Sequence, residues 1–355
     1  MALRERRGLR GVTPRPVRLA ASRWLAHRAS ARLERDLAAM VARGGPIVAG
    51  PWLGEVGFEL LYWVPFLAWF AERFAVRPER ILVLSRGGTG SWYGAFAGSY
   101  ADVFDQVTPA VFRDRHDTRV LQLGEQKQTQ VTEFDRELVA TAVARSGIGN
   151  WSLLHPSRMY ELLNPFWWGH LPSTWVHRHA RYRRLLPPEA ETGDVPLPAI
   201  CGRGATRGEA GRYVAVKFYF NDCFPASDVN REFVGSTLRT LTARGPVVAL
   251  STGLDIDDHD GARVDEFGVH HLQEGLSPAR NLAVQSAVVA GASAFVGTYG
   301  GFSYLAPFHG VSSRAYYSNP AGFSQKHLQV AREAFALAGA ANLLDVRDAA
   351  AGVEP

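Results

Sequence analysis

A short apolar strand, two adjacent glycines and a helix start follow one another between residues 295 and 310. Backbone N–H groups and the positive end of a helix dipole meet at such a turn, and both favour a bound phosphate or diphosphate. The alternative is that the glycines serve the turn alone, because a tight turn often excludes a Cβ. Flanking hydroxyl groups favour the ligand, and the expected contacts are Thr298, Gly300, Gly301, Phe302 and Ser303.

A lysine interrupts the apolar and aromatic run of residues 214–220. The chain has three lysines among its 39 basic residues, so a lysine near the end of a core strand indicates a need for a compact point charge. A bound diphosphate would neutralise this charge, which is costly to bury unpaired. We expect Lys217 and Asn221 to contact the same ligand, and an ion pair of Lys217 with Asp222 is the alternative. The turn after the next strand offers backbone contacts at Thr252 and Gly253.

An acidic side chain lies in the first strand-to-helix loop, residues 53–57. The carboxylate of Glu55 would face a cleft between two halves of the chain, where it could accept a proton from an attacking hydroxyl group as a general base. The alternative is that Glu55 only interacts with the helix N-terminus, which favours negative charge. Glu59, one helical turn further, is the reserve candidate for the base and for contact with the acceptor.

All nine tryptophans lie at or before residue 175. Aromatic faces stack on the apolar faces of sugar rings, so the aromatic, histidine-rich block of residues 151–182 fits an acceptor groove. Packing in a core or lid fits it equally well. The expected acceptor contacts are Trp167, Trp168 and His170.

Four aspartates and a histidine between residues 255 and 260 look like a metal cluster at first sight. They lie in a polar loop, and the sequence offers no second set of convergent ligands. A solvated acidic loop is the favoured interpretation, although the spacing also resembles the short aspartate-x-aspartate motif of metal-dependent glycosyltransferases. We expect neither a metal ion nor a cofactor.

Basic charge is concentrated at the N-terminus. Residues 1–45 hold eleven arginines and three acidic residues, a net charge of +8, whereas the whole chain carries +5. Such an arm could lie on anionic lipid, where each cation contributes about 1 kcal/mol. A solvated extension without a partner fits equally well. The rest of the chain lacks a basic stripe and a nucleic-acid-binding motif, so we expect no nucleic-acid partner.

The cysteine content and the length of the apolar segments bear on the cellular compartment of the protein. Cys201 and Cys223 are too few for a disulfide framework, which favours a reducing environment. No segment has the run of about 20 apolar residues that a membrane-spanning helix needs, and the N-terminus lacks the apolar part of a secretory signal. We expect a cytoplasmic protein that could touch the inner face of a membrane.

Strands and helices alternate in both halves of the sequence. Strands are expected at 46–49, 81–84, 213–220, 246–250, 269–272, 295–297 and 313–317. Helices are expected at 19–41, 58–74, 91–100, 133–144, 230–243 and 277–290. This alternation predicts parallel sheets covered by helices, with ligands at the carboxyl ends of the strands.

The predicted fold class is therefore α/β, with two facing Rossmann-like domains and an interdomain cleft. A segment rich in proline, glycine and charge, residues 187–212, looks like the linker. The expected division is a basic arm at 1–45, an N-terminal domain with the aromatic insert at 46–200, and a C-terminal domain at 201–355.

Two motifs together carry a resemblance. Gly297, Gly301, Leu305, Ala306 and Gly310 stand in register with a run found in the donor-binding half of GT-B glycosyltransferases, while Tyr299, Gly300 and Tyr304 replace its aspartate, threonine and histidine. The first loop is also similar, with Gly54-Glu55 where the family has glycine-aspartate, and with Pro65 further along the helix. The pattern is most similar to that of bacterial heptosyltransferases, and more loosely to that of fucosyltransferase-like enzymes of polysaccharide synthesis.

The resemblance implies a sugar transfer. The enzyme would move a sugar from a nucleotide-diphosphate donor, bound by the C-terminal domain, to a carbohydrate or lipid-linked glycan bound by the N-terminal domain, in bacterial surface polysaccharide synthesis. The family's acidic residue is taken as its catalytic base, which supports Glu55 in that role. Two alternatives stay open: a nucleotide-sugar epimerase of the same fold, and a non-catalytic protein that binds a nucleotide sugar or a glycan.

Overall fold

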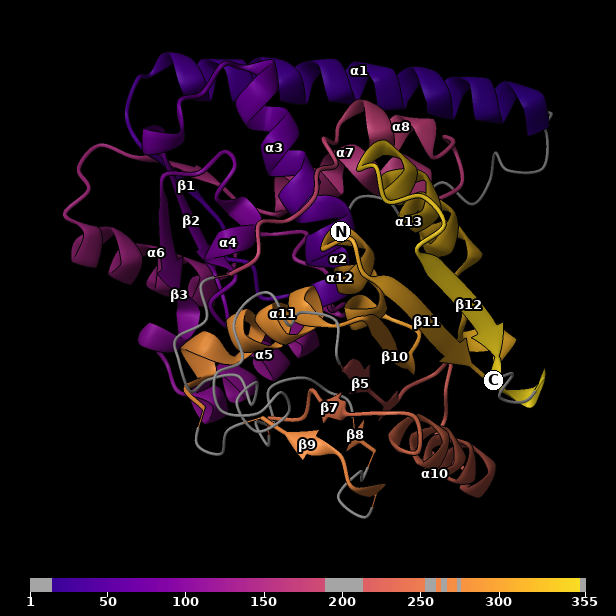
Figure 1. Ribbon diagram of the computed structural model, residues 1–355. Helices are drawn as coiled ribbons and strands as arrows, with labels where there is room; N and C mark the ends of the chain where they lie inside the picture. Colours follow the sequence, from indigo (N-terminus) through magenta and orange to yellow (C-terminus); the bar gives the residue numbers. More distant parts are fainter. Residues whose placement is uncertain (1–14, 189–212, 253–259, 263–266, 273–275, 352–355) are drawn as a thin grey trace.

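The computed structural model describes residues 15–188, 213–252, 260–262, 267–272 and 276–351 (Figure 1). The first half forms a four-stranded sheet of order β3-β2-β1-β4. Its strands are β1 (Ile47–Ala49), β2 (Ile81–Ser85), β3 (Ser99–Asp102) and β4 (Ser152–Leu154). Every neighbouring pair is parallel, so all four carboxyl ends lie at one edge of the sheet.

The second half forms a six-stranded sheet of order β12-β11-β10-β5-β7-β9, again parallel throughout. Its strands are β5 (Val214–Lys217), β7 (Val247–Ala249), β9 (His270–His271), β10 (Ala294–Thr298), β11 (Ser312–Tyr317) and β12 (Leu344–Asp348). A small antiparallel pair, β6 (Tyr219–Phe220) with β8 (Asp260–Gly261), continues from the end of β5. Parallel sheets need a crossover between their strands, and helices supply it here.

Helices cover both faces of the first sheet. They are α1 (Arg15–Ala42), α2 (Val56–Phe58), a π-helical turn (Glu59–Trp63), α3 (Val64–Arg73), α4 (Gly90–Tyr93), α5 (Pro109–Leu123), α6 (Glu133–Ser146), α7 (Ser157–Trp167) and α8 (Thr174–Arg178). Alternate residues of β1 join two apolar clusters, Ile47 on one face and Val48 on the other, because successive side chains of a strand point to opposite faces. Thr132 and Gly147 cap the two ends of α6.

The helices of the second half are α10 (Asp228–Thr242), α11 (Asn281–Gly291), α12 (Gly301–Phe308) and α13 (Gln325–Leu337). The last of these packs back on the first half, beside α7 and α8 in Figure 1. Tyr62 Oη lies 2.6 Å from His327 Nδ1, and Glu333 pairs with His177 at 2.5 Å. One apolar cluster accordingly runs through both halves, from Ala26 to Ala349.

The predicted fold class, α/β with two parallel sheets, is confirmed. The expected helix at residues 91–100 is wrong in its second half, because α4 ends at Tyr93 and the chain enters the edge strand β3 at Ser99. The pattern missed β4 and β12, each at an edge of its sheet. The proposed boundary at residue 200 lies outside the described residues. Within them, no helix is both long and apolar enough to cross a bilayer.

Candidate active site

A cleft of about 1130 Å³ lies between the two halves. The first half lines it with the loop after β1, the end of β2, part of α5, and residues 125–127. The second half lines it with the chain after β5 and β7 and with the first residues of α12. Both walls therefore come from the carboxyl ends of parallel strands, where ligands of open α/β sheets bind.

Glu55 lies at the mouth of the first wall, exposed to the cleft. It is the residue before α2, with an extended backbone (φ −66°, ψ 148°), and its side chain makes no capping hydrogen bond to that helix. Burial, and then the nearby negative charge of Glu55, raise the pKa of Tyr160, another residue of this wall. Glu55 thus lines the cleft and does not cap α2.

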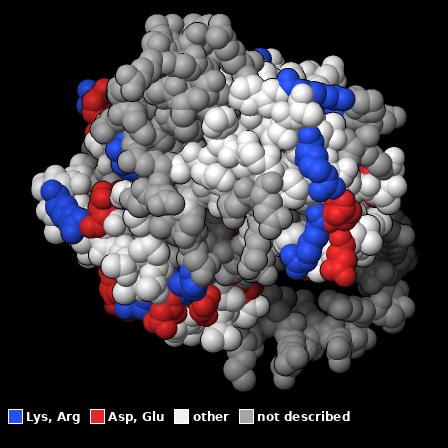
Figure 2. Space-filling view, turned by 60° about the horizontal axis from the view of Figure 1, so that its bottom comes forward, with Lys and Arg blue, Asp and Glu red and all other residues white. Residues whose placement is uncertain are grey.

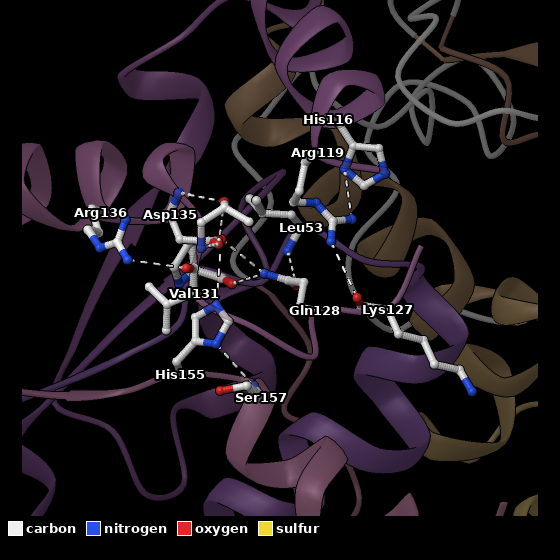
Figure 3. Close-up of polar contacts among 12 residues, drawn as sticks. Leu53, His116, Arg119, Lys127, Gln128, Val131, Asp135, Arg136, His155 and Ser157 are labelled. Carbon is white, nitrogen blue, oxygen red and sulfur yellow. Dashed lines mark hydrogen bonds and ion pairs between the residues drawn. The ribbon is translucent and has the colours of Figure 1, made fainter. Parts of the chain in front are cut away.

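A buried glutamine holds the loop that carries Glu55 (Figure 3). The backbone N–H of Leu53 donates to Gln128 Oε1 at 2.9 Å, and Gln128 Nε2 donates to the carbonyl of Pro51 at 2.9 Å. The side-chain amide therefore pairs with the loop as a neighbouring strand would. Only 1% of Gln128 is exposed, so both loop groups would lose their partners without it.

An aspartate and a histidine support Gln128 from behind (Figure 3). Gln128 Nε2 also lies 3.3 Å from Asp135 Oδ1, whose other oxygen accepts from the backbone and hydroxyl of Thr132. The N–H of Ser157 donates to His155 Nδ1, which assigns the ring proton to Nε2, 3.6 Å from Asp135. Burial raises the pKa of Asp135, but contacts with His155 and Thr132 outweigh it and the pKa is lowered.

The neighbouring segment brings a lysine to the same wall. Buried Arg119 donates to the carbonyl of Gln126 at 2.8 Å and lies 3.5 Å from that of Lys127. Lys127 lines the cleft, and its Nζ lies 4.8 Å from the centre of the Trp167 ring and 6.0 Å from that of Phe58. Two of the three lysines of the chain, Lys127 and Lys217, thus line one cleft from opposite walls.

Lys217, at the end of β5, is the cation of the second wall. Its Nζ donates to Gln285 Oε1 at 2.7 Å and lies 3.7 Å from the centre of the Phe302 ring. Gln285 is oriented in turn by Asn281, to which its Nε2 donates at 2.7 Å. A neutral amide and an aromatic face thus hold the ammonium at the wall of the cleft, where its positive charge attracts an anion.

The start of α12 reaches the cleft through Gly300, Gly301 and Phe302. A Cβ at Gly301 would lie 2.6 Å from the backbone nitrogen of Gly57, and one at Gly300 would collide with the hydroxyl of Tyr219. Close packing of α12 against α2 therefore already requires a glycine at residue 301. The backbone that the sequence suggested as an anion seat is therefore the same backbone that joins the two halves.

Two expected donor contacts face the protein interior instead. The hydroxyl of Ser303 donates to the carbonyl of Gly300 at 2.7 Å, and the hydroxyl of Thr298 donates to the carbonyl of Tyr219 at 2.8 Å. Both residues are fully buried and neither lines the cleft. Their role is to shape the turn, which corrects the expectation of direct ligand contact.

The remaining donor candidates lie on the rim of β5 and β7. Asn221 and Thr252 line the cleft, whereas Gly253 lies outside the described residues. Asn221 Oδ1 already accepts from the backbone N–H groups of Cys223 and Phe224, at 3.0 and 2.9 Å. This leaves its side-chain NH₂ group as the donor suited to a ligand oxygen.

Glu59 does not reach the cleft. It is fully buried behind the first wall, where its Oε1 accepts from Ser85 at 2.6 Å and from Tyr93 at 2.5 Å. Burial raises its pKa to about 7 against the opposing effect of these hydrogen bonds. No protein atom of the described residues donates to its Oε2. We therefore drop Glu59 as an acceptor contact.

The aromatic acceptor candidates lie beside the cleft and not in its lining. Trp168 is 66% exposed, and His170 accepts a hydrogen bond from Arg23 through its backbone carbonyl. Trp167 is half-buried and presents a ring face to Lys127, which does line the cleft. Trp168 and His170 therefore do not line the cleft. Trp167 is linked to it only through its contact with Lys127.

Sequence reasoning missed Arg86, Lys127 and Tyr160, which all line the cleft. Arg86 donates to the carbonyl of Gly54 at 2.9 Å. It directly follows β2, and a basic residue at the end of a predicted strand could have been recognised as a site candidate. The scarcity of lysine, which singled out Lys217, applied equally to Lys127. Tyr160 carried no signal, because an aromatic residue on a helix most often packs in a core.

Charges around the cleft are mixed in sign. The cleft is lined by four basic residues and four acidic ones, Arg86, Arg113, Lys127 and Lys217 with Glu55, Asp117, Glu125 and Asp222. Figure 2 likewise shows basic and acidic side chains next to one another on one face of the molecule. Among the described residues, no group of three or more His, Cys, Asp or Glu side chains is placed to hold a metal ion. The acidic loop 255–259 lies outside that part of the chain.

Comparisons with known proteins give similarity only at the level of structure. No protein-family model and no curated protein match the sequence. The chain is similar to the glycosyl transferase family 9 protein of Veillonella parvula, with 12% identity, a TM-score of 0.44, and 86% of each chain covered. It is also similar to E. coli ADP-heptose lps heptosyltransferase II, with 13% identity, a TM-score of 0.43, and 85% of this chain and 90% of that one covered. A third similar structure is E. coli heptosyltransferase WaaC with ADP, with 13% identity, a TM-score of 0.38, and 85% of this chain and 92% of that one covered. We base function on the cleft alone.

Proposed function

We propose that the protein is a glycosyltransferase that moves a sugar from a nucleotide-diphosphate donor to a hydroxyl group of a carbohydrate or lipid-linked glycan. The observation that supports this most is the pairing of an exposed carboxylate, Glu55, with a cation, Lys217, on opposite walls of one cleft. A base on one side and an anion seat on the other are what a displacement at an anomeric carbon requires. The volume of about 1130 Å³ suits a nucleotide sugar together with part of an acceptor.

The transfer can be written with these residues in place. Glu55 accepts the proton of the acceptor hydroxyl, whose oxygen forms the new bond to the anomeric carbon of the donor. The bond from that carbon to the diphosphate oxygen breaks, and the nucleoside diphosphate leaves with the electron pair. Lys217 and the N-terminal end of α12 stabilise the negative charge that develops on the leaving oxygen.

The finer assignment follows from the same argument. The second wall would take the donor and the first wall the acceptor, with Lys127 beside Trp167 at the acceptor end. Because the two cysteines favour a reducing environment, we place the reaction in the cytoplasm, at the inner face of a membrane if the acceptor is lipid-linked. Synthesis of a bacterial surface polysaccharide is the process that this substrate pair fits.

A nucleotide panel tests the donor assignment. Thermal unfolding would be followed with UDP, GDP, ADP, CMP and dTDP sugars, since a ligand of the folded state raises the Tm according to its affinity. We expect the sugars of one nucleotide to raise the Tm of the wild type. Most of this rise should be lost in Lys217→Met, which removes the charge but keeps a side chain of similar size. If no nucleotide raises the Tm at millimolar concentration, the donor assignment fails.

An acceptor requirement separates the alternatives. An epimerase would convert the bound nucleotide sugar with no acceptor present, which chromatography of the nucleotide product detects. A binding protein would show the Tm shift but release no nucleoside diphosphate with any acceptor. A transferase releases the nucleoside diphosphate in proportion to the glycosylated acceptor.

A further inference from the structure

Helix α1 has two unlike sides. Its inner side is buried against α7 and the core through Ala26, Ser30, Leu33 and Leu37. We define the outer face of α1 as the exposed positions on the side of the helix opposite these buried residues. They are Ala20, Ala21, Trp24, Leu25, Arg28, Ala31, Arg32, Arg35, Ala38 and Ala39. Alanine, arginine and two large apolar residues make up this outer face, and it contains no carboxylate.

The two large apolar residues are strongly exposed. Trp24 is 59% and Leu25 is 58% exposed, on a helix whose opposite side is packed. The guanidinium of Arg28 lies 5.4 Å from the centre of the Trp24 ring, so a cation and an indole stand together on the surface. Tryptophan favours the boundary between lipid and water, where its ring is half in an apolar medium and half wet.

The acidic residues of α1 lie away from this face. Glu34 is partly buried, 3.6 Å from Arg73 and 3.8 Å from His179 on the inner side. Asp36 is exposed on the flank between the two sides. The outer face therefore presents Arg28, Arg32 and Arg35, with Asp36 at its edge, one turn from Arg32.

We propose that the outer face of α1 docks on an anionic lipid bilayer, with the helix lying flat in the interface. Trp24 and Leu25 would enter the headgroup region while the arginines contact lipid phosphates. A helix of 28 residues is about 42 Å long, and it runs along the periphery of the molecule in Figure 1. Nucleic acid would also attract the arginines, but its phosphates offer nothing to an exposed leucine and tryptophan. This proposal does not depend on the activity proposed above.

Vesicle sedimentation of the full chain tests the docking. Wild type would be spun with vesicles of phosphatidylcholine alone and with vesicles that also contain phosphatidylglycerol. We expect binding only to the anionic vesicles, with Arg28→Gln plus Arg32→Gln about 30-fold weaker, because each cation near such a surface contributes about fivefold. Trp24→Ser plus Leu25→Ser should reduce binding at both low and high salt, since apolar insertion is not screened.

Matched controls keep the result specific to α1. Leu121, on α5, is 84% exposed, and Arg136, on α6, is exposed. Leu121→Ser and Arg136→Gln should bind vesicles like the wild type, and the Tm of every variant should stay close to the wild-type value. The proposal is overturned if the wild type binds neither vesicle or both equally. It is overturned as well if the α1 variants bind like the wild type, which would assign the binding to residues outside α1.

Discussion

The two walls of the cleft are built by different means. On the first wall, the loop of Glu55 is held by side chains from a distant segment, through Gln128 and its partner Asp135. On the second wall, the turn before α12 is held by hydroxyl groups of its own residues, Thr298 and Ser303, and by a contact between two glycines, while Lys217 extends directly from a central strand. The proposed base is thus placed by side chains of a distant segment, and the proposed anion seat by residues of its own turn.

In the proposed mechanism, this difference separates catalysis from donor binding. Substitutions in the first wall should change turnover while donor binding persists, because the donor seat does not depend on Gln128. Substitutions that disturb the second wall should affect donor affinity or the packing of the halves. The following changes test this division, and they are ordered by the size of the expected effect.

Removing the base should have the largest effect. Glu55→Gln keeps the shape of the side chain but cannot accept a proton, so we expect kcat to fall by about 10²–10⁴-fold. The donor-induced rise in Tm should persist, since Glu55 lies on the opposite wall. Glu133→Gln, an exposed glutamate on α6, is the matched control and should keep wild-type turnover. Equal turnover in both variants would remove Glu55 from the mechanism.

A buried titratable group behind the first wall should make stability depend on pH. The pKa of Glu59 is raised from 4.5 to about 7 by burial, so the folded state holds this proton more tightly than the unfolded state. Its stabilising contribution is complete below pH 4.5 and is lost as the pH rises to 7, a change of about 3 kcal/mol.

Glu59→Gln removes this titration. In urea unfolding between pH 4.5 and 8, the variant should gain stability relative to the wild type by about that amount as the pH rises. A difference between the two proteins that stays constant over this range would show that Glu59 does not titrate as inferred.

Loss of the amide support should combine a stability cost with a turnover cost. Gln128→Ala leaves the N–H of Leu53 and the carbonyl of Pro51 without partners, which costs about 2–3 kcal/mol. We expect kcat to fall while the donor-induced Tm shift is retained. Gln122→Ala, at an exposed position, provides the control for the loss of a glutamine side chain that supports no buried loop. If donor binding falls together with kcat, the two walls are not independent.

The glycine contact gives the smallest expected effect. Gly301→Ala places a Cβ 2.6 Å from the backbone nitrogen of Gly57, and overpacking of this kind costs about 2 kcal/mol. Gly149→Ala meets no atom within 4 Å and should be neutral. Urea midpoints of both variants measure the difference. A neutral Gly301→Ala would mean that the two halves can separate at this point.

The sequence predicted the parts that depend on local pattern. Apolar runs bounded by glycine, such as residues 295–297, identified the central strands; Glu55 lies in the loop after one of them, and Lys217 ends another. Edge strand β3 was missed because Ser-Tyr-Ala-Asp has no apolar run, and its pairing with β2 is a long-range contact. The support by Gln128 could not be predicted either, because a glutamine in a polar stretch gives no sign of burial.

The hydroxyl groups beside the glycines teach a related point. Thr298 and Ser303 have the right type and spacing to bind a ligand, yet each bonds to a neighbouring carbonyl. Spacing alone cannot distinguish a hydroxyl that meets a ligand from one that fixes a turn, because both roles need the same residue at the same place.

Helix α13 belongs to the second half of the chain but packs on the first half, so non-covalent contacts link the two halves in addition to the connecting segment. A protease cut within residues 189–212 would sever the covalent connection, yet Tyr62 and His177 would still hold the far end of the second piece through His327 and Glu333. We expect the two fragments to remain together after cleavage and to separate only in denaturant. Split versions of the chain, produced as two polypeptides, should therefore reassemble without a tether.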